Sequence, residues 1–453
     1  MSFLSVKFII LITFLLISLH FIRNKTTERM ILLASSYLFY GSFDLTMLAV
    51  LICLSVFTWI GGYMLNKAQK DGRPKTARII CLSCIAGQTF ILMFFKFAGL
   101  FPMPVGLSFY MLQAISFLAD NYRGELSEFP SLIDTLVYIG FFPQIVSGPI
   151  VKAKDFIPQL NSRKKLDTAR LSYGIQLFAL GAFMKLVMAD RLAVSVDSVY
   201  SAPLAYSGLS LFFASVGYSL QLMFDFAGYS NMAIGVAWLL GYDLGRNFNL
   251  PYLSSDPSDF WKRWHISLST WLRDYVYIPL GGSRKGKIRT YINIFLTMLV
   301  SGLWHGSTLN FLIWGAVHGL WQVIHRVLRD VRPSSSKKTI GTGRKYISVI
   351  LSFLMVNFLW IPFRTETLSD TITVISRIIT MQPGISYFYV YTFIFGAILL
   401  ISQLIAVHLN NGNDPFKPLP LNRMYGKVLF CCFLIAIAMF AYFGNGAFIY
   451  AKF

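Results

Sequence analysis

The sequence predicts an all-α polytopic membrane protein, and three features support this fold class. Of the 453 residues, 55% are hydrophobic and only 13% are charged, less charge than a water-soluble chain of this length usually carries. Apolar segments of about 17 to 25 residues recur along the chain, each long enough to cross a bilayer as a helix. The alternation of polar and apolar residues that a membrane β-barrel requires is missing from the sequence.

The net charge of +20 is concentrated in short loops between the apolar segments. The basic clusters lie at residues 23–29, 67–78, 152–170, 284–289 and 326–345. Such clusters are typical of the cytoplasmic loops of membrane proteins, where anionic lipid supplies the nearest counter-charge. We therefore expect a lipid-bilayer environment and no nucleic-acid partner.

The first apolar segments divide at recognisable breaks. Residues 4–21 form the first expected helix, which we interpret as a transmembrane span because no small-residue cleavage site follows it. Residues 30–65 are too long for one span, and Gly41–Asp44 supplies a turn between two. A helix at about 79–98 crosses back, with Lys96 near its end and able to extend toward the interface.

The next segments carry polar residues and prolines. Residues 106–121 are apolar but short, and they contain Gln113, Ser116 and Asp120, which favours a packed or re-entrant helix. Residues 132–150 contain two prolines, which predict a broken helix. Cys81 and Cys84 form a CxxC inside an apolar helix, and we expect buried thiols there.

Further helices are expected near residues 171–190, 208–223, 226–241, 346–362, 389–408 and 427–443. Asp225, Asn231 and Asp243 lie within or beside the helices expected at 208–223 and 226–241. We expect these polar side chains to face the protein interior, either for helix pairing or for function. The series gives about 11 transmembrane helices in one domain, residues 1–453, together with re-entrant or interfacial helices. Counted from the basic loops, both termini are expected on the extracytoplasmic side.

The stretch from residue 254 to residue 322 concentrates tryptophan, histidine and arginine, and we interpret it as the catalytic core. Asp256 followed by Pro257 predicts a helix start. Through Asp274, helical periodicity places the aromatic residues on one face and Lys262, Arg263 and Arg273 on the other. We therefore expect one amphipathic helix at the membrane surface, with His265 at the border of its aromatic face.

A glycine-rich basic loop follows at residues 281–287. Its backbone N–H groups and lysines are able to hold a phosphate. The loop lacks the spacing of a Walker motif, so an ordinary cytoplasmic basic loop is the alternative interpretation.

His305 is the strongest candidate for a catalytic residue. It stands between Trp304 and Gly306 in an apolar segment, where a histidine is costly without a partner or a cavity. A histidine that titrates near neutral pH is suited to take a proton from an acceptor hydroxyl. A structural, hydrogen-bonded histidine is the first alternative. A metal site with His265 and His318 is the second, but the spacings match no ligand pattern and we expect no metal.

No G-x-S-x-G motif accompanies these histidines. The sequence therefore favours direct acyl transfer over a covalent serine intermediate.

At these residues the chain resembles the membrane-bound O-acyltransferase family, in particular its branch of alginate O-acetyltransferases. The resemblance rests on the central motifs DFWKRWHISLS at 259–269, WLRDY at 271–275, IPLGG at 278–282, GLWHG at 302–306 and His318-Gly319. It also includes SYLFY at 36–40, PVGLSF at 104–109, FPQ at 142–144 with GPI at 148–150, FLW at 358–360 with Phe363-Arg364, and FIY at 448–450. The tail after Tyr450 departs from the family's usual aromatic or glutamine-containing end.

The resemblance implies a ring of helices around a central funnel or tunnel, with His305 as the catalytic histidine and His265 as the second family histidine. We expect the substrates to contact Trp304, Trp261, Trp264, Arg263 and His318. The resemblance further implies a bacterial inner-membrane enzyme that uses acetyl-CoA, or another phosphopantetheine-linked acyl donor, from the cytoplasm. The acceptor is expected to be an extracytoplasmic polysaccharide, reached with a partner acetyltransferase or acceptor protein.

Two alternatives remain open from the sequence. The same motifs resemble, less closely, the proteins that transfer D-alanine to teichoic acid, and residue chemistry does not separate acetyl from D-alanyl transfer. The other alternative is a transporter or flippase of a polymer precursor, in which the polar intramembrane residues would line a permeation path. The clustering of histidines in one stretch and the lack of repeated halves argue against it.

Overall fold

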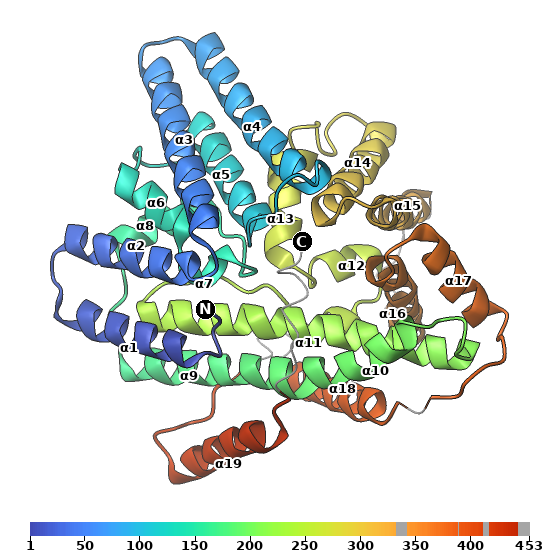
Figure 1. The fold of residues 1–453 in the computed structure, drawn as a ribbon. Helices are drawn as coiled ribbons and strands as arrows, with labels where there is room; N and C mark the ends of the chain where they lie inside the picture. The colour runs from blue at the N-terminus through green and yellow to red at the C-terminus, as the bar shows by residue number, and fades with distance from the viewer. Residues whose placement is uncertain (332–341, 388, 411–415, 443–453) are drawn as a thin grey trace.

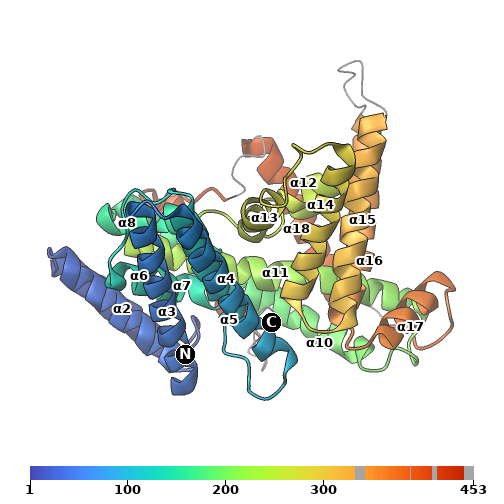
Figure 2. The ribbon, with the colours of Figure 1, turned by 90° about the horizontal axis from the view of Figure 1, so that it is seen from above.

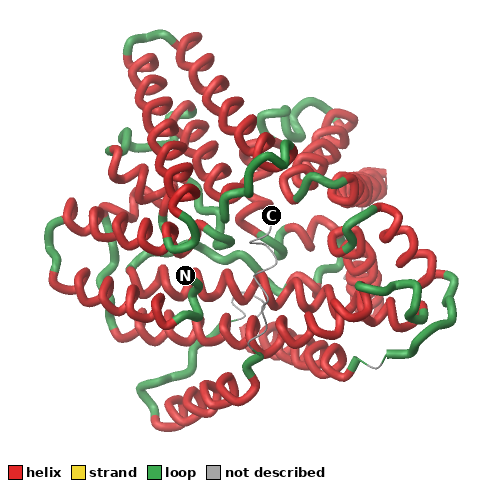
Figure 3. Tube along the Cα trace, viewed as in Figure 1, coloured by secondary structure: helices red, strands yellow, loops and turns green. Residues whose placement is uncertain are grey.

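The computed structural model describes residues 1–331, 342–387, 389–410 and 416–442, and within these ranges the chain is built from helices joined by loops, with no strand (Figures 1 and 3). A single bridge between Tyr206 and Ile385 is the nearest approach to a sheet in this part of the chain. The all-α fold class expected from the sequence is confirmed.

The helices of the first half are α1 (Val6–Phe21), α2 (Lys25–Gly41), α3 (Leu45–Lys70), α4 (Pro74–Phe97), α5 (Leu107–Tyr122), α6 (Leu132–Gly140), α7 (Phe142–Ile145), α8 (Ala153–Asn161), α9 (Thr168–Phe183), the π-helix η1 (Met184–Ala189), α10 (Asp190–Tyr200) and α11 (Gly208–Leu240). Those of the second half are the 3₁₀ turn η2 (Pro251–Leu253), α12 (Pro257–Trp261), α13 (Ile266–Leu272), the π-helix η3 (Arg273–Tyr277), α14 (Lys287–His305), α15 (Leu309–Val331), α16 (Thr342–Arg364), α17 (Leu368–Ile379), α18 (Val390–Asn410) and α19 (Met424–Phe440).

Several breaks fall where the sequence predicts them. The chain turns between α2 and α3, where the side chain of Asp44 accepts hydrogen bonds from the first backbone N–H groups of α3. The proline-containing segment 132–150 is broken into α6 and α7 at Phe141. Almost every residue of α5 is buried, as a packed helix requires. Cys81 and Cys84 are buried free thiols, which confirms the expectation for this pair.

The prediction of two helices between residues 208 and 241 is wrong. Residues 208–240 form one continuous helix, α11, instead of two helices separated near residue 224. The polar residue at the expected break, Asp225, is buried within α11 and forms an ion pair with Lys185 at 2.6 Å. Lys185 lies in η1 and also pairs with Asp190 at 2.8 Å. A carboxylate with this partner can remain in a helix interior, and its burial agrees with the expectation that Asp225 faces the protein interior.

Helices α9 and α11 pack side by side (Figure 1). Glycines seven residues apart on each helix meet one another: a Cβ atom at Gly181 would lie 2.4 Å from the carbonyl of Gly228, and one at Gly235 would lie 2.6 Å from the carbonyl of Gly174. Small residues at such positions let two helix backbones touch inside a membrane. Asp243, expected in the interior, lies exposed in the loop after α11.

Within the described residues, four helices are long and apolar enough to cross a membrane: α3, α4, α11 and residues 343–364 of α16. Three shorter apolar helices accompany them, at residues 6–21, 390–405 and 424–440. The chain is therefore a multi-pass membrane protein, while the count of about 11 spans and the positions of the termini stay predictions. The centre of the basic 326–345 segment and the tail motif at 448–450 lie outside the described residues.

Candidate active site

The central stretch does not form the single surface helix that periodicity predicts. Asp256 caps α12 as expected, its side chain accepting from the N–H of Asp259, but α12 ends at Trp261. The chain then bends sharply at His265, which has a left-handed backbone (φ 43°), and continues as α13 and the π-helix η3. A left-handed conformation costs a residue other than glycine about 1 to 3 kcal/mol, and such residues concentrate at functional sites.

Residues 247–249 supply the hydrogen bonds that the bend requires. The N–H of Ile266 donates to the carbonyl of Asn247 at 2.9 Å, and the N–H of Asn249 donates to the carbonyl of Arg263 at 2.9 Å. The partner residues in these bonds are separated by 14 to 19 positions in the sequence, so helical periodicity does not indicate them. As a consequence, His265 is fully buried instead of lying at the border of a surface helix.

Asn247 fixes the orientation of His265, and sequence reasoning missed this residue. Its Nδ2 donates to the hydroxyl of Ser230 at 3.0 Å, which leaves Oδ1 as the acceptor for Nδ1 of His265 at 3.1 Å. The hydroxyl of Ser267 also donates to this Oδ1, at 2.9 Å. Because Nδ1 of His265 carries the proton in this arrangement, Nε2 carries the lone pair.

His305 and His318 are delivered by the helix pair α14 and α15, which lie side by side (Figure 2). The pair comes into backbone contact at Gly302 and Gly315, where a Cβ atom on Gly302 would lie 2.4 Å from the carbonyl of Phe311. His305 is the last residue of α14, at the end opposite the basic residue Lys287. At 1.5 Å per residue the two are about 27 Å apart along the helix axis.

Tryptophan rings connect the three histidines into one aromatic cluster. The ring of Trp304 lies 6.1 Å from His265 and 4.8 Å from His305, between centroids. The ring of Trp314, in turn, lies 5.0 Å from His305 and 4.7 Å from His318. The cluster places His265 and His305 both against the ring of Trp304.

The expected substrate-contacting residues divide between this cluster and its surroundings. Trp261 belongs to the cluster, since its ring lies 5.1 Å from that of His318. Trp264 packs in the adjoining core against Trp360, at 5.0 Å. Arg263 points elsewhere: its described partners are the carboxylate of Asp259, at 2.7 Å, and the carbonyl of Asn249.

His318 is the most unusual member of the cluster. It is fully buried, and neither of its ring nitrogens has a hydrogen-bond partner in the part of the chain that the structure describes. A buried imidazole without partners is destabilising, so an unmet ring nitrogen indicates a place for a water molecule or a substrate group.

Lys96 is a second residue that sequence reasoning missed. Instead of extending toward the interface, its ammonium group donates to the backbone carbonyl of Trp304 and lies 5.8 Å from the Trp304 ring centroid. It thereby places a positive charge at the C-terminal end of α14, where the helix dipole favours a cation. The indole N–H of Trp304 donates to the carbonyl of Ser108 in α5, at 3.1 Å. Trp304, next to His305, is thus held from both α4 and α5.

Lys152 and Asp274 form a half-buried ion pair at the surface near α13. Burial by itself raises the pKa of Asp274, but hydrogen bonds and charge from Arg273 and Lys152 outweigh it and lower the pKa below the usual value of 3.8. A groove of about 350 Å³ is lined by Lys152, Arg246, Asp155 and Asp243 together with Ile266, Ser267 and Thr270. The groove therefore reaches Ser267, whose hydroxyl lies 3.4 Å from Nδ1 of His265.

A larger cavity, of about 500 Å³, lies between α9, α11 and α18 and includes Arg246 and Phe248 in its wall. Phe248 contacts Phe226, at 5.0 Å between ring centroids, and Phe226 in turn contacts His265, at 4.7 Å. Neither this cavity nor the groove near Ser267 includes any of the three histidines in its wall. A funnel that opens onto His305 therefore stays a prediction.

His265, His305 and His318 all lie in this aromatic cluster, each with its ring in contact with a tryptophan ring. Among the described residues no group of three histidine, cysteine, aspartate or glutamate side chains is arranged to hold a metal ion. This part of the chain instead offers proton-transfer groups, a lysine ammonium and aromatic walls.

Comparison with known proteins shows the family to which the chain is related. Residues 29–363 match the model of the membrane-bound O-acyltransferase family. A probable alginate O-acetylase of Pseudomonas putida is 36% identical over 392 residues, covering 81% of this chain and 78% of the relative. A peptidoglycan O-acetyltransferase of Helicobacter pylori is 30% identical, covering 80% of this chain and 76% of that protein. A teichoic acid D-alanyltransferase of Bacillus subtilis is 32% identical, with 56% of this chain and 67% of that protein covered.

Proposed function

The chain belongs to the membrane-bound O-acyltransferase family and is an O-acyltransferase, and from this premise we propose that it moves an acetyl group from a cytoplasmic donor to an extracytoplasmic polysaccharide. The observation that carries the proposal is that the rings of His265 and His305 both lie against the ring of Trp304. Two imidazoles beside one aromatic wall are suited to act on one reacting group. The longer matches to O-acetylating relatives favour acetyl over D-alanyl transfer.

We assign the role of general base to His305. In the proposed reaction its imidazole takes the proton of the acceptor hydroxyl, and the oxygen attacks the carbonyl carbon of the donor thioester. The C–O bond forms, the C–S bond breaks, and the proton passes to the departing sulfur. The ammonium of Lys96, which contacts the carbonyl of Trp304, is close enough to the site to favour the negative charge that develops on the carbonyl oxygen.

His265 has a different environment and a different proposed role. Its Nδ1 proton is directed to Asn247, so its Nε2 is the atom able to accept a hydrogen bond from a substrate. We propose that His265 orients the donor or a water molecule beside Trp304. Trp261, Trp264 and His318 are proposed to form or support the wall of the substrate path.

The donor is proposed to be acetyl-CoA or another phosphopantetheine-linked thioester. Its phosphates require cations on the side of entry. The sequence offers Lys262, Arg263 and the basic 284–289 segment, and the structure adds the groove whose wall includes Lys152 and Arg246 together with Asp155 and Asp243. Ser267, which belongs to the hydrogen-bond network of His265, also lines this groove, and this proximity supports the groove as the entrance.

The acceptor is proposed to approach from the other side, where α14 ends at His305. The relatives' names point to a polymer hydroxyl, and an extracytoplasmic partner protein is proposed to present it. In this arrangement the protein conducts an acyl group across the inner membrane of a bacterium. The aromatic cluster around His305 must then open to admit both substrates, since it is closed in this structure.

A donor-cleavage assay tests the proposal. Purified protein is mixed with acetyl-CoA labelled in the acetyl group, or with a D-alanyl carrier-protein thioester, and release of free thiol is followed with and without a polysaccharide hydroxyl acceptor. Acetyl transfer predicts thiol release from acetyl-CoA that increases with acceptor. Thiol release from the D-alanyl donor alone would support the D-alanyl alternative, and release from neither would contradict the proposed donors.

A further inference from the structure

A second site lies far along the chain from the histidine cluster, at the basic end of α1. A cavity of about 520 Å³ opens there between α1, α2 and the segment that follows α8. Its apolar wall consists of Leu16, Leu19, Ile22, Leu160, Leu166 and Leu239. Its polar wall consists of His20, Arg23, Lys25, Glu28, Asn161, Arg163 and Lys165. Four cationic side chains thus face one carboxylate across a hydrocarbon floor.

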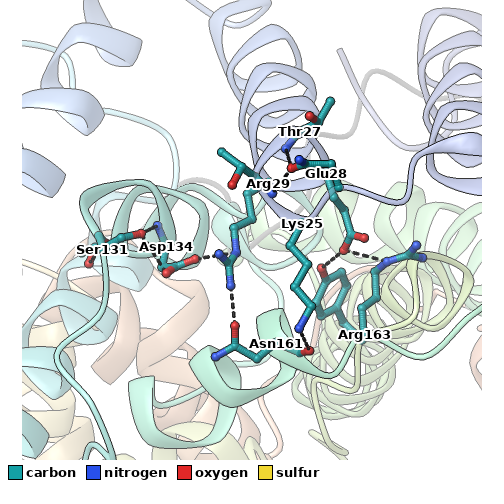
Figure 4. Close-up of polar contacts among 12 residues, drawn as sticks. Lys25, Thr27, Glu28, Arg29, Ser131, Asp134, Asn161 and Arg163 are labelled. Atoms are coloured by element: carbon teal, nitrogen blue, oxygen red, sulfur yellow. Dashed lines mark hydrogen bonds and ion pairs between the residues drawn. The ribbon is translucent and has the colours of Figure 1, made fainter.

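The frame of this cavity is held by a network of polar contacts (Figure 4). The guanidinium of Arg163 donates to the carboxylate of Glu28 at 2.7 Å and to the carbonyl of Leu19 at 3.3 Å. The ammonium of Lys25 donates to the carbonyl of Asn161 at 3.0 Å, and Arg29 donates to the side chain of the same asparagine. The ends of α1, α2 and α8 are therefore fixed relative to one another.

The only carboxylate among the residues of the cavity wall takes part in this network. Glu28 is paired with Arg163, which leaves Arg23 and Lys165 as exposed cations with no ion pair among the described residues. Lys25 is satisfied by a neutral carbonyl and keeps its charge uncompensated. A site with fixed walls and uncompensated positive charge is prepared for an anion.

The cavity also lies beside an apolar face of the kind that lipid covers. The outer face of α1 exposes large apolar side chains, including Ile10, Phe14, Ile17 and Phe21, as a bilayer-facing helix does. The cavity opens at the end of this face, beside Ile22 and Arg23. Hydrocarbon chains can therefore enter along the leucines while a phosphate remains among the cations.

We propose that this cavity binds an anionic phospholipid, with its phosphate held by Arg23, Lys25 and Lys165 and an acyl chain lying against Leu16, Leu19 and Leu239. The ligand class follows from the pairing of a cationic rim with a floor of leucines. A free phosphate would satisfy only the rim, and a zwitterionic lipid would bring its own cation next to the rim. The bound lipid would fasten the α1–α2 end of the molecule to the cytoplasmic leaflet.

Native mass spectrometry of the full-length protein in detergent tests this proposal, with phosphatidylglycerol, phosphatidylcholine and inorganic phosphate as probes. The test variant is Arg23→Gln/Lys165→Gln, which keeps polar side chains at two exposed positions and leaves the Arg163–Glu28 frame intact. The matched control is Lys70→Gln/Lys75→Gln, which removes two exposed cations from the adjoining ends of α3 and α4. A thermal unfolding curve for each variant checks that the fold is retained.

We expect the wild-type protein to bind phosphatidylglycerol in preference to phosphatidylcholine. The test variant should bind phosphatidylglycerol on the order of 10 to 30 times more weakly, and the control should match the wild type. Inorganic phosphate at millimolar concentration should not displace the lipid, because it makes no contact with the leucines. Equal binding of the two lipids, equal losses in both variants, or displacement by phosphate would each overturn the proposal.

Discussion

Asn247 offers the sharpest test of how the site is built. Its Oδ1 accepts from Nδ1 of His265 at 3.1 Å and from the hydroxyl and backbone N–H of Ser267 at 2.9 and 3.3 Å. In Asn247→Ala the imidazole N–H and the backbone N–H of Ser267 lose this acceptor in a buried environment. At about 1 to 3 kcal/mol for each unsatisfied donor, the substitution should cost about 2 to 6 kcal/mol before the structure relaxes.

The effect on activity should exceed the effect of a general loss of stability. Without Asn247 the proton of His265 is free to occupy either ring nitrogen, and the ring is free to turn. We expect the turnover number for acyl transfer to fall at least tenfold while the KM for the acceptor changes little, because the substitution removes no substrate contact. Thiol release from acetyl-CoA and acyl transfer, measured together at a temperature where the variant stays folded, give both parameters.

Two further variants separate positioning from folding. Asn247→Asp keeps an acceptor oxygen for Nδ1 and should recover a large part of the activity that alanine loses. Asn231→Ala is the matched control, since this asparagine also lies in the core region but its described contact is the sulfur of Met184. If Asn247→Ala retained full turnover, or if aspartate rescued nothing, the assignment of Asn247 as the residue that orients His265 would be refuted.

Three other predictions follow from the packing, the charges and the topology. Gly302→Ala should lower stability by about 1 to 3 kcal/mol, because the new Cβ would lie 2.4 Å from a backbone carbonyl of α15, whereas Gly343→Ala meets open space and should not; thermal unfolding compares the two. The lowered pKa of Asp274 means that its stabilising contribution is present above the usual value of 3.8 and disappears as the pH falls through its folded pKa, so Asp274→Asn should show a smaller drop in unfolding temperature between pH 6 and pH 3 than the wild type. Cysteines placed singly in the 326–345 segment and at Phe453, in a background without native thiols, should react only with a cytoplasmic and only with an extracytoplasmic reagent, respectively; a terminus labelled from the cytoplasm would remove one span from the proposed topology.

The sequence predicts well what depends on neighbouring residues. The turn before Asp44, the break at Phe141 and the cap at Asp256 each use a local signal, and the structure has all three. The family resemblance, which rests on motifs such as GLWHG, also holds. These features share a short range: each is decided within a few residues of the chain.

The errors share the opposite property. Periodicity does not show that Asn247 supplies a backbone acceptor to Ile266, so the bend at His265 was missed. It does not show that Lys185 pairs with Asp225 inside α11, which is one continuous helix where the sequence predicts two. Lys96 looked like an interfacial lysine because its acceptor, the carbonyl of Trp304, is 208 residues away. Contacts between residues that are distant in the sequence leave no pattern among neighbouring residues from which they could be predicted.

The central claim is that His305 is the base that activates the acceptor, and one comparison of rates tests it most directly. Acyl transfer is measured for purified His305→Ala and for His325→Ala, a control that removes a histidine of α15 whose ring contacts none of the described aromatic residues. Both variants should be folded, and the control should transfer at the wild-type rate. We expect the rate of acyl transfer by His305→Ala to be lower than that of the wild type by a factor of about 10² to 10⁴. Transfer at a tenth or more of the wild-type rate would contradict it.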